Sequence, residues 1–293
     1  MCYTESCIYY LNLRVTLLKH LRIINTLNID TALGAVSFVF IVSSVRKVEV
    51  DIAIYLALIV SVLSIYNLDH LIDAYWLKET KSSFRHLFYQ KYFKVLLVWQ
   101  FLVLVAGVWL LFQLPLAVIY AGIAMGAAIG LYFLIIFNTR YKNYLLREVI
   151  IAAGYTFSVA VIPFTASQNM PKLDFYGILL IIFLIALTNL WVFAVYDYEV
   201  DKAQNHHSIA MSVANKNLAK MARAVVGLLL VIIGMYMLYF QFWILGMSLI
   251  AVELIYLMLL TNQSFYRKNE YYRIVGESIL ILPSLVLLAA YAI

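Results

Sequence analysis

Long apolar stretches recur along the whole chain, and each is long enough to cross a lipid bilayer. A bilayer core is about 30 Å thick, and only helices or closed barrels satisfy their backbone groups inside it. Because 65% of the 293 residues are hydrophobic and 12% are charged, an ordinary soluble domain is excluded. The stretches lie at roughly 31–46, 51–73, 92–113, 115–137, 148–167, 174–197, 222–241, 243–261 and 273–292. They predict an all-α polytopic membrane protein, a bundle of nine transmembrane helices with a central cavity that opens near the cytoplasmic face.

The apolar stretches divide the chain into two parts. Residues 1–30 form an N-terminal segment, which we interpret as an amphipathic helix at the cytoplasmic face, and residues 31–293 form a single membrane domain. With 11 Gly and 4 Pro in the chain, we expect helices that are mostly continuous. The shortest connections, at residues 113–115 and around Gln241, predict tight turns between antiparallel neighbours.

The basic residues predict how the bundle sits in the membrane. If the N-terminus is cytoplasmic, all but three of the 21 Lys and Arg fall on the cytoplasmic side. The exceptions are Arg46, Lys47 and Lys172. The net charge of +6 therefore reflects topology, favours acidic lipid headgroups, and requires no nucleic-acid partner.

Two pairs of aspartates close two of these helices on the same predicted side. Asp69 and Asp73 end the second stretch, and Asp197 and Asp201 end the sixth. A spacing of four residues puts both carboxylates of a pair on one helix face, whereas His70 is expected to point off that face. Carboxylates at the edge of hydrocarbon are costly unless a cation neutralises them. A structural salt-bridge network would do so, but we favour a divalent metal that carries a polyanion.

The chemistry that this arrangement favours is the binding of a lipid diphosphate. Mg²⁺ prefers oxygen ligands and keeps coordination positions for water and substrate phosphate. Basic residues nearby would neutralise the negative charge of the diphosphate that the metal does not neutralise. These residues are Lys78, Lys81, Arg85, Arg140, Lys142 and Lys202. The apolar bundle beneath would hold the hydrophobic tail.

The aspartate motifs resemble those of the UbiA superfamily of intramembrane prenyltransferases. The stretch D-Y-E-V-D at 197–201 matches the second motif of that superfamily, D-x-x-x-D. The stretch F-N-T-R-Y-K-N-Y at 137–144 is similar to its basic loop between helices four and five. The first motif, N-D-x-x-D-x-x-x-D, is matched in part, because Asp69 and Asp73 stand at its last two acids while Tyr66 stands at its first.

The resemblance implies an activity, a cofactor and roles for individual residues. It implies transfer of a prenyl group from a polyprenyl diphosphate to an acceptor, in the lipid bilayer of a prokaryotic plasma membrane, and it leaves the acceptor unidentified. Mg²⁺ would be held against the diphosphate by Asp69, Asp73, Asp197 and Asp201. The diphosphate would be neutralised by Arg85, Arg140, Lys142 and Lys202. The pocket would be lined by Tyr66, Asn67, Tyr196 and Asn28. Metal and cations together would stabilise the leaving pyrophosphate.

Two further acids lie in the last two apolar stretches. Glu253 is an intramembrane carboxylate, which is functional by default. It could bind a polar acceptor or remain protonated in a helix contact, and the sequence leaves both interpretations open. Glu277 lies one turn after Arg273 and is predicted to pair with it.

Two other functions remain open at this point. A terpene cyclase would keep the ionisation of the diphosphate and close the resulting cation on itself. A non-catalytic binder or transporter of lipid diphosphates is motivated by the incomplete first motif.

Overall fold

Long α-helices make up most of the computed structural model, which describes residues 18–76, 84–139, 144–166, 170–203 and 208–292. No β-strand occurs among those residues, and 18–26 are helical. The long helices are α2 (Ile29–Arg46), α3 (Ile52–Trp76), α5 (Phe93–Leu111), α6 (Leu116–Thr139), α7 (Tyr144–Ala166), α8 (Leu173–Ala203), α10 (Asn215–Phe240) and α11 (Trp243–Thr261). The short ones are α4 (Phe84–Lys91), α9 (Ile209–Val213), α12 (Gln263–Tyr266) and η1 (Lys268–Glu270). The chain ends with α13 (Tyr271–Ser278), η2 (Ile279–Ile281) and α14 (Leu282–Tyr291).

The predicted class, a polytopic bundle of membrane helices, is confirmed. Within the described residues, eight helical segments are long and apolar enough to cross a membrane. The helix α6 adds a shorter apolar stretch, Leu116–Ala128. The total of nine crossings and the central cavity stay predictions.

Several helices begin or end next to a residue with left-handed backbone geometry. Asn28 (φ 58°) precedes α2, and Lys47 (φ 54°) follows it with its backbone N–H bonded back to the last turn. At Lys47 this geometry satisfies carbonyl groups that the C-terminal end of α2 would otherwise leave unpaired. Gln241 (φ 60°) separates α10 from α11, and Pro115 immediately precedes α6. The chain turns at both predicted places, and the prediction of packed neighbours is confirmed for α10 and α11.

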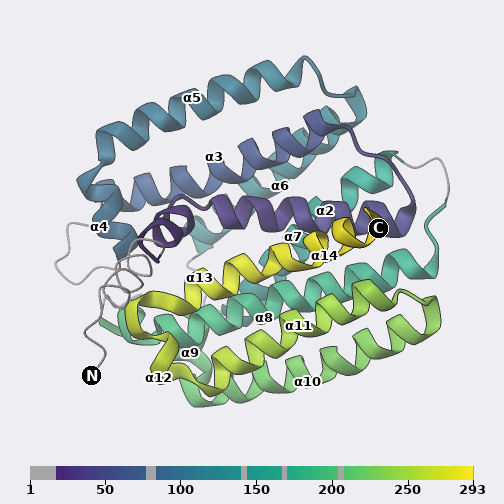
Figure 1. Cartoon of the computed structure of the whole chain (residues 1–293). Helices are drawn as coiled ribbons and strands as arrows, with labels where there is room; N and C mark the ends of the chain where they lie inside the picture. Colours follow the sequence, from purple (N-terminus) through teal and green to yellow (C-terminus); the bar gives the residue numbers. More distant parts are fainter. Residues whose placement is uncertain (1–17, 77–83, 140–143, 167–169, 204–207, 293) are drawn as a thin grey trace, which may run out of the picture.

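The helix α8 is the centre of the packed core. It packs against α2, α7, α10 and α11, and its side chains Ile178, Ile182, Ile185 and Val192 are fully buried. Figure 1 shows α3 beside α5 along one edge of the bundle and α10 beside α11 along the opposite edge. The short helices α4, α9 and α12 gather at the end of the bundle where α3 and α8 also end (Figure 1). We call this end, which carries both aspartate pairs, the polar end.

The outer surface of α5 is apolar. Val95, Phe101, Trp109 and Phe112 are each more than half exposed. A patch of this kind would promote aggregation in water, whereas lipid tails are as apolar as the side chains themselves. The exposure of α5 therefore identifies a face of the bundle that lies against lipid.

Two helices differ from the simple continuous segments that the sequence predicts. The helix α8 extends six residues past Asp197 to Ala203, so Asp197 and Asp201 both lie within it, one turn apart. The last crossing is interrupted by the 3₁₀ turn η2, just before Pro283. A proline ring cannot join the hydrogen-bond ladder of a helix, which accounts for the break at this position.

Candidate active site

Three possible metal ligands lie close together on α3. Asp69, His70 and Asp73 each offer a ligand atom, and these atoms all lie within 4.8 Å of one another. His70 Nδ1 is 3.9 Å from Asp69 Oδ2. The prediction that His70 points away from the aspartates is therefore wrong. The next residue on a helix lies only about 100° round the axis, and an imidazole ring is long enough to reach back.

The second aspartate pair has a different environment. Arg273 Nη2 donates to Asp197 Oδ1 at 2.8 Å and to Oδ2 at 2.7 Å, and the Tyr272 hydroxyl donates to Oδ1 at 2.5 Å. The predicted pair of Glu277 with Arg273 is therefore wrong, because the nearer carboxylate belongs to α8 and not to the next turn of α13. Neither Asp197 nor Asp201 belongs to the ligand group on α3.

The helix α4 packs against α3 and holds two of its polar side chains. Arg85 Nη1 donates to His70 Nε2 at 3.2 Å, and the Tyr89 hydroxyl donates a short hydrogen bond to Asn67 Oδ1. The Tyr89 ring also packs edge-on against His70, with centroids 5.2 Å apart. Burial raises the pKa of Tyr89 to about 12, so its hydroxyl remains a donor at physiological pH.

A buried polar network joins the segment before α2 to α13. Asn25 Nδ2 donates to Asp30 Oδ2 at 2.8 Å and to Glu277 Oε2 at 2.7 Å. Thr31 Oγ1 donates to the same Glu277 oxygen at 3.0 Å, and Arg85 Nη2 lies 3.6 Å from Glu277 Oε1. Because Asn25, Asp30 and Glu277 are all buried, this network fixes the position of Arg85 at the polar end.

A second set of contacts ties the start of α4 to the turn before α13. Arg22 Nη2 lies 3.3 Å from Glu270 Oε2, and the Phe84 backbone N–H donates to Glu270 Oε1 at 3.2 Å. The Arg22 guanidinium also stacks over the Phe84 ring at 3.7 Å from its centroid. Residues from the two ends of the chain therefore close the same side of the polar end.

Tyr66 marks an accessible surface between these elements. It is 40% exposed, yet it lies within electrostatic range of Glu277 on α13, Arg85 on α4 and Asp69 on its own helix. Tyr155 on α7 is within the same range.

The other predicted pocket residues are buried in the packing. Asn28 and Asn67 are fully or almost fully buried, and Tyr196 stacks flat on Tyr272 with ring centroids 4.2 Å apart. Glu253 is fully buried on α11, and neither of its carboxylate oxygens has a hydrogen-bond partner within the described part of the chain.

The predicted diphosphate-binding cations are only partly accounted for. Arg85 takes part in the contacts above, and Lys202 is exposed in the last turn of α8. Arg140 and Lys142 lie outside the described residues.

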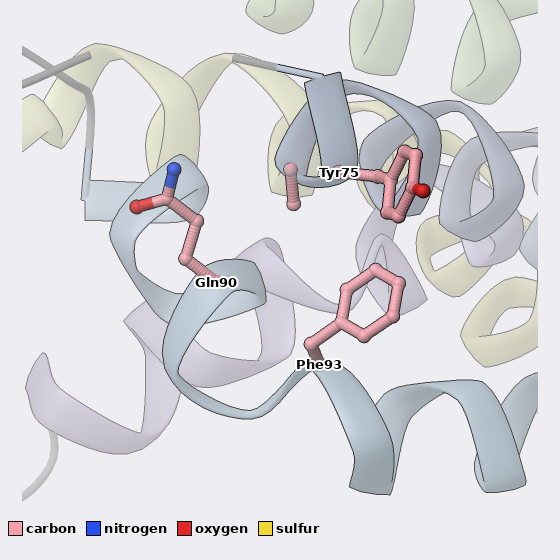
Figure 2. Close-up of a pocket in the computed structure, with 4 residues that line it drawn as sticks. Tyr75, Gln90 and Phe93 are labelled. Carbon is pink, nitrogen blue, oxygen red and sulfur yellow. The ribbon is translucent and has the colours of Figure 1, made fainter. Parts of the chain in front are cut away.

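A pocket of about 380 Å³ lies where α3, α4 and α5 meet. Its described lining residues are Ala74, Tyr75, Gln90 and Phe93. Figure 2 shows the rings of Tyr75 and Phe93 near one another with Gln90 on the other side, and the two ring centroids are 6.4 Å apart. The pocket therefore presents an aromatic wall and one amide, directly after the turn of α3 that carries Asp73.

The sequence did not predict several residues of the site, which lie in the last crossing and around the start of α2. Arg273, Tyr272, Asn25 and Asp30 all make the contacts described above. Asp30 could have been found, because it directly precedes the first apolar stretch, and a carboxylate at the edge of hydrocarbon signals a polar site. Arg273 gives no comparable signal, since its partner lies 76 residues away.

The donor set on α3 fits a divalent metal ion. The carboxylates of Asp69 and Asp73 lie one helical turn apart, within 4.8 Å of one another, and both are exposed; the acceptor nitrogen of His70 is occupied by Arg85, so the carboxylates are the ligands. Asp69 and Asp73 would hold such an ion, which would supply positive charge against a phosphate group.

The fold and the site define a class of protein, a multi-pass α-helical membrane protein with carboxylates, arginines and a histidine collected at one end. The fold is similar to that of a solved structure of a digeranylgeranylglyceryl phosphate synthase in membranes, with a TM-score of 0.50 and 17% sequence identity. The alignment covers 89% of this chain and 96% of that one. No family model matches the chain, and no curated protein matches it. The likeness confirms, at the level of the fold, the resemblance that the aspartate motifs indicate.

Proposed function

We propose that this chain is an intramembrane prenyltransferase, which moves a prenyl group from a polyprenyl diphosphate to an acceptor held in the membrane. The observation that carries the proposal is the ligand group of Asp69, His70 and Asp73 at the polar end of an apolar bundle. Arg273 supports it, because it holds Asp197 at the same end of the bundle. The similarity of the fold to a membrane prenyl-lipid synthase points the same way.

The roles follow from the charges. Asp69 and Asp73 would hold Mg²⁺, which when bound would supply positive charge to the leaving pyrophosphate. Arg85, fixed by Glu277, would orient the diphosphate beside that bond. Tyr66 would face the reacting carbon, where an aromatic ring stabilises positive charge. The apolar interior would hold the prenyl chain and exclude water from the cation.

The direct test is pyrophosphate release by the purified protein in detergent, supplied with Mg²⁺ and labelled geranylgeranyl diphosphate. We expect release that the double substitution Asp69→Asn and Asp73→Asn reduces at least a hundredfold, because it removes both carboxylates. Glu199→Gln is the matched control: this acid is exposed at the same end of α8, outside the contacts of the site. Absence of release from the unaltered protein with prenyl chains of several lengths would contradict the proposal.

Two observations favour a second candidate, a non-catalytic binder of lipid diphosphates. Tyr66 stands in place of an acid, and Asp197 is already paired with Arg273. Metal-dependent binding of the labelled diphosphate without any pyrophosphate release would select this function. A labelled product that contains no acceptor would instead select a cyclase.

A further inference from the structure

The carboxylate of Asp197 accepts three hydrogen bonds from its protein neighbours, which occupy most of its acceptor positions. Its two oxygens accept hydrogen bonds from Arg273 at 2.8 and 2.7 Å and from Tyr272 at 2.5 Å. The pair is mostly enclosed, with 17% of the Arg273 side chain and 23% of the Asp197 side chain exposed. A metal ion at Asp197 would have to displace the guanidinium and leave a mostly buried positive charge without its partner. This carboxylate therefore does not fit an open metal ligand.

One nitrogen of the Arg273 guanidinium group, Nη1, is available to donate a hydrogen bond to a ligand. Its Nη2 bonds to Asp197 and its Nε bonds to the Tyr272 hydroxyl at 3.1 Å. Its Nη1 makes no hydrogen bond within the described residues and is not among the enclosed polar atoms that lack a partner. The guanidinium group can thus bind Asp197 on one side and a phosphate oxygen on the other, since its donors form a planar fork.

The position of Arg273 relates it to the ligand group on α3. Arg85 links α13 to α3, because it lies 3.6 Å from Glu277, one turn after Arg273, and donates a hydrogen bond to His70. Arg273 therefore lies on the helix that is joined, through Arg85, to the turn of α3 that carries Asp69 and Asp73. That is the place where a cation is needed if a diphosphate bridges the two helices.

We propose that Arg273 takes the place of a metal ion at the second aspartate pair, so that this chain holds a diphosphate with a single divalent ion and one arginine. The ion is bound by Asp69 and Asp73 with His70 beside them, and Asp197 positions Arg273. This inference rests on the proposed function, because it assumes that a prenyl diphosphate is the ligand. It assigns Asp197 a positioning role and Arg273 a binding role.

The test counts the bound metal ions. Full-length protein in a phosphate-free detergent is saturated with Mn²⁺ and geranylgeranyl thiolodiphosphate, whose C–S bond resists ionisation, and is then desalted. Metal per chain is measured by inductively coupled plasma mass spectrometry. We expect about one Mn²⁺ per chain for the unaltered protein and about two for Arg273→Gln, because that change frees Asp197 beside Asp201.

Two further variants control the experiment. Arg267→Gln removes one positive charge from an exposed residue at the same end and should leave the count at about one. Asp197→Asn combined with Arg273→Gln removes both charges of the buried pair, so it leaves neither charge uncompensated, and should also bind about one. Size-exclusion chromatography establishes that each variant is folded.

The possible outcomes distinguish failure of this inference from failure of the proposed function. Two Mn²⁺ ions per chain in the unaltered protein, or one per chain in folded Arg273→Gln, would overturn the inference. Neither result would contradict the proposed prenyltransferase function. No Mn²⁺ in any variant would overturn both the single-ion site and the metal dependence of the proposed reaction.

Discussion

The hydrogen bond between Tyr89 and Asn67 offers a direct test of how α4 is held. Tyr89 is fully buried and Asn67 is 1% exposed, so water cannot replace the bond if it is lost. Tyr89→Phe removes the hydroxyl but keeps the ring that packs against His70. It leaves Asn67 Oδ1 unsatisfied, and the Asn67 Nδ2 atom already has no partner among the described residues. An unsatisfied buried group costs about 1–3 kcal/mol, which is the expected loss in the free energy of unfolding.

The measurement is reversible unfolding in mixed micelles, in which a denaturing detergent is titrated and the tryptophan fluorescence is followed. The matched control is Tyr92→Phe, which removes a hydroxyl from a 40% exposed ring that follows α4 and should change stability by less than about 0.5 kcal/mol. Because burial raises the pKa of Tyr89 to about 12, its hydroxyl is protonated in both states well below pH 10. The loss should therefore be the same at pH 6 and pH 9. A Tyr89→Phe protein as stable as Tyr92→Phe would refute the assigned contact.

Further predictions concern the packing of the last helices. Gly276→Ala would place a Cβ 2.8 Å from the Phe193 ring, which packs against Tyr272, so we expect a loss of about 1–3 kcal/mol in unfolding free energy. Gly227→Ala on α10 meets nothing within 4 Å and should gain about 0.5–1 kcal/mol in the same assay. Glu253→Leu should keep or raise stability, since it removes a buried carboxyl without a described partner. A loss above about 1 kcal/mol for Glu253→Leu would show that the carboxyl has a stabilising contact.

The positions of the membrane helices could be predicted to within a few residues for most segments. Bilayer thickness sets the length of an apolar segment, and charged or turn-forming residues bound it, so both signals are local in sequence. The segment predicted at 243–261 coincides with α11, for example. The extension of α8 past Asp197 could not be predicted in the same way, because its last turns are polar and no longer carry the apolar signal.

The aspartate pairs could be found from sequence, but their partners could not. A four-residue spacing predicts that Glu277 pairs with Arg273. In the structure Arg273 pairs with Asp197 on another helix. Glu277 contacts Asn25, Thr31 and Arg85. These partners are set by the packing of helices that are distant in the chain. Spacing rules describe only neighbours on one helix, so they cannot choose among cations from several helices.

The bonds that close the polar end have a consequence for the order in which the protein is made. Arg22 and Asn25 are among the first described residues, and their partners Glu270 and Glu277 lie 248 and 252 residues later. At about 5–20 residues per second, a ribosome needs roughly 12–50 s to bridge that interval. During that time the helices that carry both aspartate pairs enter the membrane without the segment that contains Arg273. A nascent chain therefore cannot form these bonds until residues 270–277 have been synthesised.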